Sequence, residues 1–192
     1  MNLANKITIA RIFLIPFFML CLMQYPIWLT SKFTLFEILS QNGVIIAAIL
    51  FVLASATDKL DGYIARKYNQ ITNLGKLLDP LADKLLVSVA LIMMVQKNMV
   101  STWMVVVIIG REFIITALRM AAASQKVALA ADHYGKWKMV LQVMGITAVL
   151  LNNYPFSLFT AYRVDNLIMT LATLMTLYSG CNYIARNYKN LK

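Results

Sequence analysis

Long apolar runs alternate with short polar segments along the chain, and this pattern predicts a bundle of membrane-spanning helices. A helix needs about 20 residues to cross a hydrocarbon core of roughly 30 Å. Two runs are too short alone, so we expect the second to continue past its aspartates and the fifth to begin inside the preceding polar loop. The six expected spans are residues 12–29, 43–66, 75–96, 102–123, 139–151 and 166–185.

The N-terminal segment, residues 2–11, mixes apolar and polar positions, so we expect it to lie along the membrane interface before the first span. A polar connector is expected over residues 30–42. No cleavable signal peptide is expected, because the first apolar run is too long and no small-residue cleavage site follows it. The predicted fold is all-α: a single membrane domain over residues 1–192, with six transmembrane helices and a short N-terminal interfacial segment.

Composition agrees with a membrane protein. The chain is 60% hydrophobic and 14% charged, whereas soluble domains are about 45–50% apolar and about 25% charged. The formal charge of +10 is typical of loops that face anionic lipid, and we expect no nucleic acid partner. Cys21 and Cys181 lie in apolar runs without the spacing of a disulfide or zinc site, so both are interpreted as small hydrophobic residues.

The distribution of basic residues predicts the orientation. Six spans place both termini on the same side of the membrane. Of the 18 lysines and arginines, only Lys32, Lys97 and Arg163 fall on the opposite side. The positive-inside rule therefore predicts cytoplasmic termini.

Four of the eight acidic residues lie in one short window between the second and third spans: Asp58, Asp61, Asp79 and Asp83. Carboxylates near hydrocarbon are costly unless they are paired, hydrated or bound to a metal. The spacings of three and four residues put each pair on one helix face, and the two helices form a hairpin. Oxygen ligands of this kind select Mg²⁺, Mn²⁺ or Ca²⁺, and two such ions could clamp a diphosphate. The alternative is a set of solvated charges at helix ends, offset by neighbouring basic residues.

The window also matches a longer pattern, D-x-x-D-G-x-x-A-R, then eight residues, then G-x-x-x-D-x-x-x-D. Its fixed positions are Asp58, Asp61, Gly62, Ala65, Arg66, Gly75, Asp79 and Asp83. This pattern resembles the signature of the CDP-alcohol phosphotransferase family. The resemblance implies transfer of a phosphatidyl or similar group from a CDP-linked donor to an alcohol, with release of CMP. It also implies a homodimer in a bacterial plasma membrane. The aspartate window joins the second and third spans, so the positive-inside rule places it on the cytoplasmic face.

The family's residue roles carry over by position. Asp58, Asp61 and Asp79 match metal ligands, and Asp83 matches the proton acceptor, which can also touch a metal; the implied cofactor is Mg²⁺ or Mn²⁺, as two ions. Gly62, Arg66 and Thr72 match positions that hold the CDP portion, and Ala65 and Gly75 leave room for it on the two facing helices. Asn5 and Thr8 resemble an N-terminal N-x-x-T-x-x-R element near the nucleotide, with a helix N-cap as the equal alternative.

Basic residues outside the aspartate window are the candidates for binding the acceptor alcohol. Arg111 and Arg119 lie eight residues apart, close to one face of the fourth span, and with Lys136 and Lys138 they could bind a phosphate. The alternative for all four is anchoring on the cytoplasmic side. The segments GREFIITALR and GKWKMVLQ resemble those of bacterial family members that use CDP-diacylglycerol and sn-glycerol 3-phosphate. Asn182 departs from the Asp-Tyr pair expected in many relatives.

Other functions remain open at this point. Within the family, the acceptor could be inositol phosphate, serine or phosphatidylglycerol. An intramembrane prenyltransferase also uses aspartate-rich motifs, but with more spans and different spacing. A cation transporter could use the carboxylates as an ion site, although transporters bind ions near the membrane midplane between repeats, and no repeat is visible.

Overall fold

The computed structural model describes the backbone of residues 3–67, 73–125 and 134–187, and the side chains of residues 7–57, 81–125 and 134–187. The described backbone is helical apart from short turns and connections, and it contains no strand. The chain divides into two compact units, Met1–Met99 and Val100–Lys192. This confirms the predicted all-α class at the level of secondary structure.

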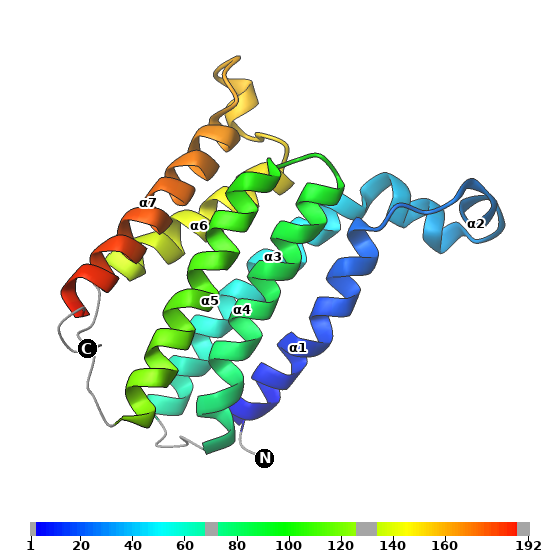
Figure 1. Cartoon of the computed structure of the whole chain (residues 1–192). Coiled ribbons are helices and arrows are strands. Elements are labelled where there is room, and N and C mark those ends of the chain that lie inside the picture. The colour runs from blue at the N-terminus through cyan, green and yellow to red at the C-terminus, as the bar shows by residue number, and fades with distance from the viewer. Residues whose placement is uncertain (1–2, 68–72, 126–133, 188–192) are drawn as a thin grey trace. The chain divides into compact units, whose positions relative to one another are not determined.

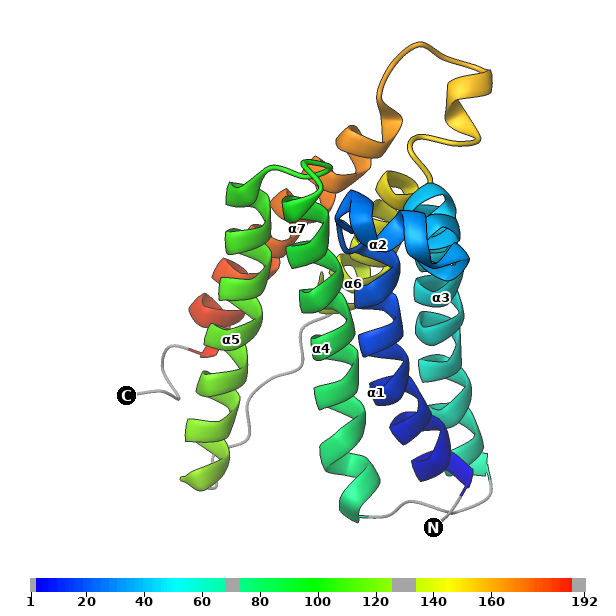
Figure 2. The same ribbon diagram turned by 90° about the vertical axis from the view of Figure 1, so that its right-hand side faces the viewer.

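The first unit is built on three long helices. Helix α1 packs against α3 and α4, α3 also contacts α4, and the short α2 contacts α3. Figures 1 and 2 show α1, α3 and α4 side by side, with α2 beyond the end of α1. The bounds are α1 Leu3–Leu22, α2 Ile27–Lys32, α3 Thr34–Lys67 and α4 Asn73–Gln96.

Small residues allow the helices of the first unit to approach closely. Ala47, Ala48 and Ala54 of α3 are buried beside large side chains such as Phe51. Gly43 is the closest point, because a Cβ atom there would collide with the backbone carbonyl oxygen of Cys21 on α1. Membrane helices commonly associate through small residues of this kind, since packing rather than water exclusion holds them together.

The second unit packs α7 against both α5 and α6. The described part of this unit contains α5 Thr102–Ser124, α6 Tyr134–Leu150, the 3-10 turn η1 Phe156–Leu158 and α7 Val164–Asn187. The buried face of α7 is rich in small and hydroxyl side chains: Ala172, Thr173, Thr176, Ser179 and Gly180. The two threonine hydroxyls donate to backbone carbonyls one turn earlier, at 2.9 and 2.6 Å, so this polar face is buried with its hydroxyl groups bonded.

The connection between α6 and α7 is held by side chains at its ends. Asn153, in the left-handed region with φ of 66°, donates through its amide nitrogen to the Tyr162 carbonyl at 3.0 Å. Its amide oxygen accepts from the backbone N–H of Asp165 at 3.1 Å. Arg163 donates to both carboxylate oxygens of Asp165, at 3.0 and 2.8 Å. A buried carboxylate and two turn residues therefore fix how the chain enters α7.

Several predicted element positions are confirmed. Helix α3 continues through Asp58 and Asp61 to Lys67, α4 and α5 match the third and fourth predicted segments, and α6 begins inside the preceding polar loop. The third and fourth segments were predictable from their apolar runs and polar boundaries, and the extensions of α3 and α6 from the length that a membrane span needs.

The N-terminal third differs from the prediction. The segment over residues 2–11 is not separate, because one helix runs from Leu3 to Leu22. The first helix ends at Leu22 rather than at residue 29, since Pro26 restricts the preceding residue and cannot donate a helical hydrogen bond. The predicted connector over residues 30–42 is largely helical, as its polar residues include no helix breaker.

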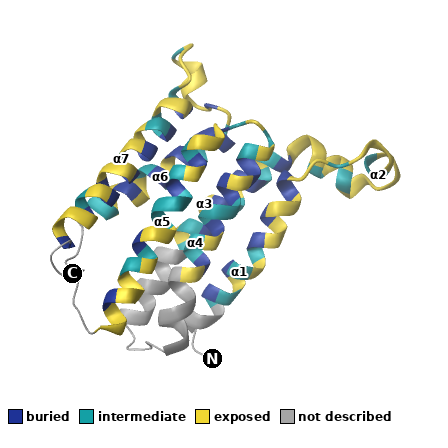
Figure 3. Cartoon of the chain, viewed as in Figure 1, coloured by how far each residue is buried: buried dark blue, intermediate teal, exposed yellow. Residues whose placement is uncertain are grey.

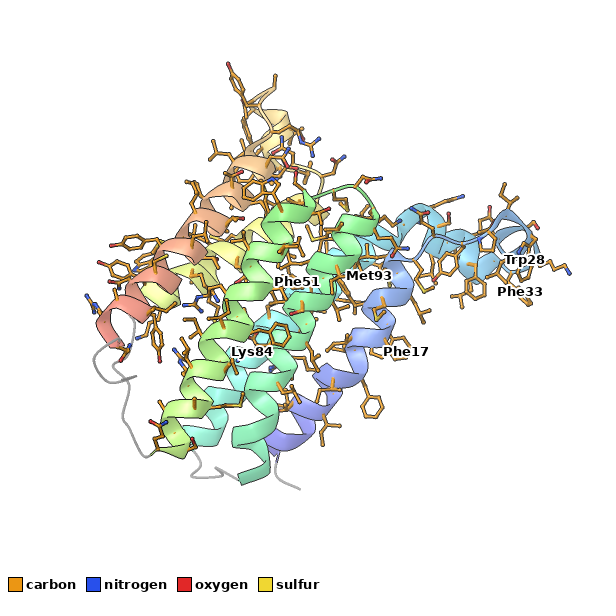
Figure 4. The ribbon with its side chains drawn as sticks, viewed as in Figure 1. Phe17, Trp28, Phe33, Phe51, Lys84 and Met93 are labelled. Atoms are coloured by element: carbon orange, nitrogen blue, oxygen red, sulfur yellow. The ribbon has the colours of Figure 1, made fainter. Side chains whose placement is uncertain are left out.

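The described residues contain two helices long and apolar enough to cross a membrane, Thr34–Thr57 and Val164–Asn187, and a shorter apolar helix, Ile7–Leu22. Large apolar side chains are also exposed on the helices, among them Phe13 of α1 and Leu174 of α7, and Figure 3 shows exposed positions along both helices. Figure 4 illustrates the contrast: Phe17 projects outward from α1, and Phe51 lies within the first unit. Six spans stay a prediction.

Candidate active site

The acidic motif occupies two helices of the first unit that contact each other. The backbones of Asp58 and Asp61 belong to the last turns of α3, and those of Asp79 and Asp83 to α4. Asp83 is half-buried. The other three aspartate side chains lie outside the described residues, as do the side chains of Asn5, Gly62, Ala65, Arg66, Thr72 and Gly75. Among the side chains that the structure describes, no three potential metal ligands gather, so the predicted metal set stays a prediction.

Helix α1 carries two buried polar side chains on one face. Thr8 is fully buried, and Arg11, three residues later, is 1% exposed. Thr8 is the sixth residue of α1, so the alternative that it caps the helix is wrong. Arg11 is the third fixed residue of the N-terminal element, but sequence reasoning treated it only as a basic residue on the side of the termini. Its complete burial is the signal that the sequence alone lacked.

In the second unit, Arg111 of α5 joins a polar cluster between helices. Its Nη2 donates to the Ser179 hydroxyl of α7 at 2.8 Å, and its Nη1 lies 3.4 Å from Oε1 of Glu112. The ammonium group of Lys138 on α6 pairs with the same oxygen. The side chains of Arg111, Glu112 and Lys138 are only 11%, 20% and 7% exposed. The cluster is therefore a compact, largely desolvated group of charges from α5 and α6, tied to α7.

Arg119 lies two turns further along α5 and is held by another residue of α7. Its Nε donates to the Tyr183 hydroxyl at 3.3 Å, and its guanidinium carbon is 5.1 Å from the centre of the Tyr183 ring. Tyr183 is 2% exposed. A guanidinium group gains from both contacts, because it has N–H donors in its plane and interacts favourably with aromatic rings.

One short segment of α7 thus positions both arginines. Ser179 accepts a hydrogen bond from Arg111, and Gly180 leaves space for that side chain, since a Cβ atom would stand 3.0 Å from Arg111 Cγ. Tyr183 follows one turn later. Sequence reasoning did not identify Ser179 or Gly180, and it noted Tyr183 only as part of a dipeptide. Their placement on one helix face was a usable signal, but their partners lie more than 60 residues away.

The two candidate lysines differ in environment. Lys138 is buried in the cluster, whereas Lys136 is exposed, because residues two apart on a helix point in different directions. Among the described residues of the second unit, the buried donor atoms without a hydrogen-bond partner are Nε of Arg111, Nε2 of Gln142 and Nδ2 of Asn182. Gln142 lies one turn beyond Lys138 on α6. Of these atoms, Nε of Arg111 belongs to the cluster and is a donor that an anionic ligand could use.

Comparison with known proteins identifies the family. The sequence model of CDP-alcohol phosphatidyltransferases matches residues 1–178, which is most of the chain. The chain belongs to the CDP-alcohol phosphatidyltransferase family.

Relatives within this family resemble the chain along its whole length. A Bacillus subtilis protein named CDP-diacylglycerol–glycerol-3-phosphate 3-phosphatidyltransferase is 44% identical over 191 residues, covering 100% of this chain and 97% of its own. Proteins of the same name from Rickettsia bellii and Haemophilus influenzae are 37% and 32% identical, each over 95% of this chain and 93% and 91% of their own.

This CDP-alcohol phosphatidyltransferase has two groups of charged residues that differ in their chemistry: the aspartates of the motif and the basic residues of the second unit. The motif on α3 and α4 supplies only carboxylate oxygens, a donor set that fits a hard divalent cation such as Mg²⁺ or Mn²⁺. The polar cluster in the second unit has two cations, Arg111 and Lys138, against one carboxylate, Glu112, and the exposed Arg119 lies two turns further along α5. The excess of positive charge in this largely buried cluster fits an oxyanion that carries more than one negative charge.

Proposed function

We propose that this protein transfers the phosphatidyl group of CDP-diacylglycerol to sn-glycerol 3-phosphate, giving phosphatidylglycerophosphate and CMP in phospholipid biosynthesis. Full-length similarity to relatives that carry this activity in their names supports the donor and the acceptor. The observation that carries the choice of acceptor is the pair of largely buried cations Arg111 and Lys138, with the exposed Arg119 two turns further along α5. A phosphorylated alcohol needs such a site, and serine does not.

The proposed chemistry begins at the acceptor hydroxyl. Asp83 takes its proton while the hydroxyl oxygen forms a bond to the β-phosphorus of the donor. The bond from that phosphorus to the bridging oxygen breaks, and CMP leaves with the electron pair. Asp58, Asp61 and Asp79, with Asp83 at the edge, would hold two Mg²⁺ or Mn²⁺ ions. When bound, these ions neutralise the charge that develops on the phosphate oxygens.

The remaining motif residues are proposed to orient the two substrates. Gly62, Ala65 and Gly75 give the nucleotide close access to the helix backbones, and Arg66 and Thr72 contact its polar groups. On the acceptor side, Arg111 can bind phosphate through two N–H groups in its plane, and Lys138 adds a mobile point charge. Precise positioning of both substrates contributes to the rate, because it converts their encounter into a reaction within one complex.

We further propose that the protein is a multi-pass homodimer of a bacterial plasma membrane, with both termini and the active site in the cytoplasm. Exposed large apolar side chains and two long apolar helices support membrane insertion. The concentration of basic residues on one side supports the orientation. The homodimer rests on family resemblance.

The deciding experiment is an acceptor survey with purified protein in mixed micelles. CDP-diacylglycerol is supplied with glycerol 3-phosphate, inositol phosphate, serine or phosphatidylglycerol, and CMP release is followed with and without a chelator. We expect release with glycerol 3-phosphate, loss with EDTA and recovery on adding Mg²⁺ or Mn²⁺. Preference for another acceptor overturns the substrate assignment, and full activity in EDTA overturns the metal assignment.

A further inference from the structure

Glu112 occupies an unusual position among the basic residues of the second unit. One of its carboxylate oxygens, Oε1, faces both Nη1 of Arg111 and Nζ of Lys138. A single anionic oxygen therefore bridges the two cations that a phosphate group would bridge. The Glu112 side chain is the most exposed of the three, at 20%, so it has more access to water than either cation.

The electrostatic consequence depends on the charge of the incoming ligand. With Glu112 in place, the trio of Arg111, Glu112 and Lys138 has a net charge of +1; without it, Arg111 and Lys138 would lose the carboxylate that they share. Because the trio is already paired, a monoanion that displaces the carboxylate exchanges one anion for another of equal charge. A phosphate monoester carries close to two negative charges at neutral pH, so it gains more from the two cations than the carboxylate loses.

From this geometry we infer that Glu112 is a specificity-determining residue. Its carboxylate occupies the position between Arg111 and Lys138, and only a dianionic phosphate monoester displaces it. The inference rests on the proposed function, in which this pair binds the acceptor phosphate. It adds a means of rejecting unwanted ligands. Phosphodiesters, carboxylates and neutral polyols all lack the second charge, and exclusion of competitors is a common source of specificity.

Selectivity comes at the expense of affinity. The Glu112 carboxylate stays near the acceptor phosphate after displacement, and like charges at short range repel in a poorly hydrated site. The wild-type protein should therefore bind glycerol 3-phosphate more weakly than a variant without this charge. A residue that only held Arg111 and Lys138 in place would have the opposite effect, because its loss would disorder both cations and weaken binding.

The test compares wild type with Glu112→Gln, which keeps the shape of the side chain and removes its charge. Two acceptors are used: glycerol 3-phosphate and its methyl phosphodiester, which has the same glycerol group and one negative charge fewer. For glycerol 3-phosphate, we expect KM to fall about threefold to tenfold, the effect of removing one nearby like charge. We expect the preference for glycerol 3-phosphate over the diester, measured as kcat/KM, to fall about tenfold or more.

Two further variants make the result interpretable. Glu37→Gln removes an exposed carboxylate at the start of α3 and should leave both constants unchanged. Glu112→Asp keeps the charge but shortens the side chain, and it should shift both constants in the same direction by a smaller factor. If Glu112→Gln does not fold, Glu112→Asp provides the test in its place.

The outcomes separate the inference from the function on which it rests. If KM for glycerol 3-phosphate rises in both Glu112 variants, or selectivity is unchanged, Glu112 is a positioning residue and the inference is wrong. If wild-type protein does not use glycerol 3-phosphate at all, the proposed function fails instead. The inference is supported if Glu112→Gln keeps its kcat, lowers KM for glycerol 3-phosphate and lowers the preference for glycerol 3-phosphate over the diester.

Discussion

Tyr183 shows how one side chain can serve a charged neighbour in two ways. Its hydroxyl accepts a hydrogen bond from Arg119, and its ring lies within cation–π range of the same guanidinium. Tyr183 is buried, whereas Arg119 is exposed, so water also reaches the guanidinium group. Loss of the hydroxyl should therefore affect Arg119 without removing the ring that packs beside it.

For Tyr183→Phe, we expect KM for glycerol 3-phosphate to rise about threefold to tenfold, since a hydrogen bond to a charged group contributes about 1.5–3 kcal/mol and this one is long. KM for CDP-diacylglycerol should not change. The matched control is Tyr178→Phe on the same helix, which keeps the ring contact with Tyr134. A rise in both Michaelis constants would show that Tyr183 supports the helix rather than the acceptor site.

Asp83 is the proposed base, so its replacement should act on turnover. For Asp83→Asn, we expect kcat to fall about 10²- to 10⁴-fold, the usual contribution of general base catalysis. The Mg²⁺ concentration that gives half-maximal activity separates a base from an essential metal ligand, because only loss of a ligand raises it strongly. Activity near the wild-type level would remove Asp83 from the mechanism, and Glu37→Gln again controls for a lost carboxylate.

At the residue scale, sequence reasoning identified charged residues better than their partners. Arg111 and Arg119 stood out because charge inside an apolar run is expensive. The pattern could not separate Lys138 from Lys136, since their burial depends on how α6 packs against its neighbours. Ser179 was hidden for the same reason: a serine in an apolar helix has no distinctive signal until its distant partner is known.

At the scale of elements, the close contact between α1 and α3 depends on a glycine, which has no side chain. Gly43 is buried against the backbone of Cys21, where any Cβ atom would collide with a carbonyl oxygen. Backbone cannot move aside as a flexible side chain can, so the two helices would have to separate or rotate. Gly110 of α5 offers a contrast, because nothing lies within 4 Å of the place where its Cβ would stand.

Gly43→Ala should therefore destabilise the protein by about 1–3 kcal/mol, the typical cost of overpacking a helix contact. Gly110→Ala should be neutral or stabilising by up to about 1 kcal/mol, as alanine favours the helix. Thermal unfolding in detergent, followed by circular dichroism, compares the two variants directly. Equal transition temperatures would contradict the close contact between α1 and α3.

Helix positions were predictable to different degrees for physical reasons. The extension of α3 through Asp58 followed from the length needed to cross lipid. The start of α3 at Thr34 was not foreseen, because exposed polar residues are compatible with either a helix or a loop. Pro26 marks the break after α1, but a membrane helix can also continue through proline, as α1 does at Pro16.

At the scale of the whole molecule, charge and hydrophobicity define the proposed orientation. In that orientation, the loop between α6 and α7 lies on the side with few basic residues, and the end of α5 lies on the opposite side. Ser157 and Gln125 are exposed residues in these two places. They offer a direct test of topology within one unit.

In a background without Cys21 and Cys181, Ser157→Cys should react with a membrane-impermeant maleimide in intact cells. Gln125→Cys should react only after the membrane is permeabilised, because the positive-inside rule places it in the cytoplasm. Retained CMP release shows that each variant is folded. Labelling of Gln125→Cys in intact cells, with Ser157→Cys protected, would reverse the proposed topology.

The unbroken course of α3 has a mechanical consequence. Its 34 residues make a rod about 50 Å long at about 1.5 Å per residue, while the hydrocarbon core is only about 30 Å thick. Its apolar part, Thr34–Thr57, leads directly into the backbone of Asp58 and Asp61. For the proposed site at these aspartates, the depth of the apolar part of α3 in the bilayer would set the distance between the reaction and the headgroups. Activity would then depend on the acyl-chain length of the surrounding lipid.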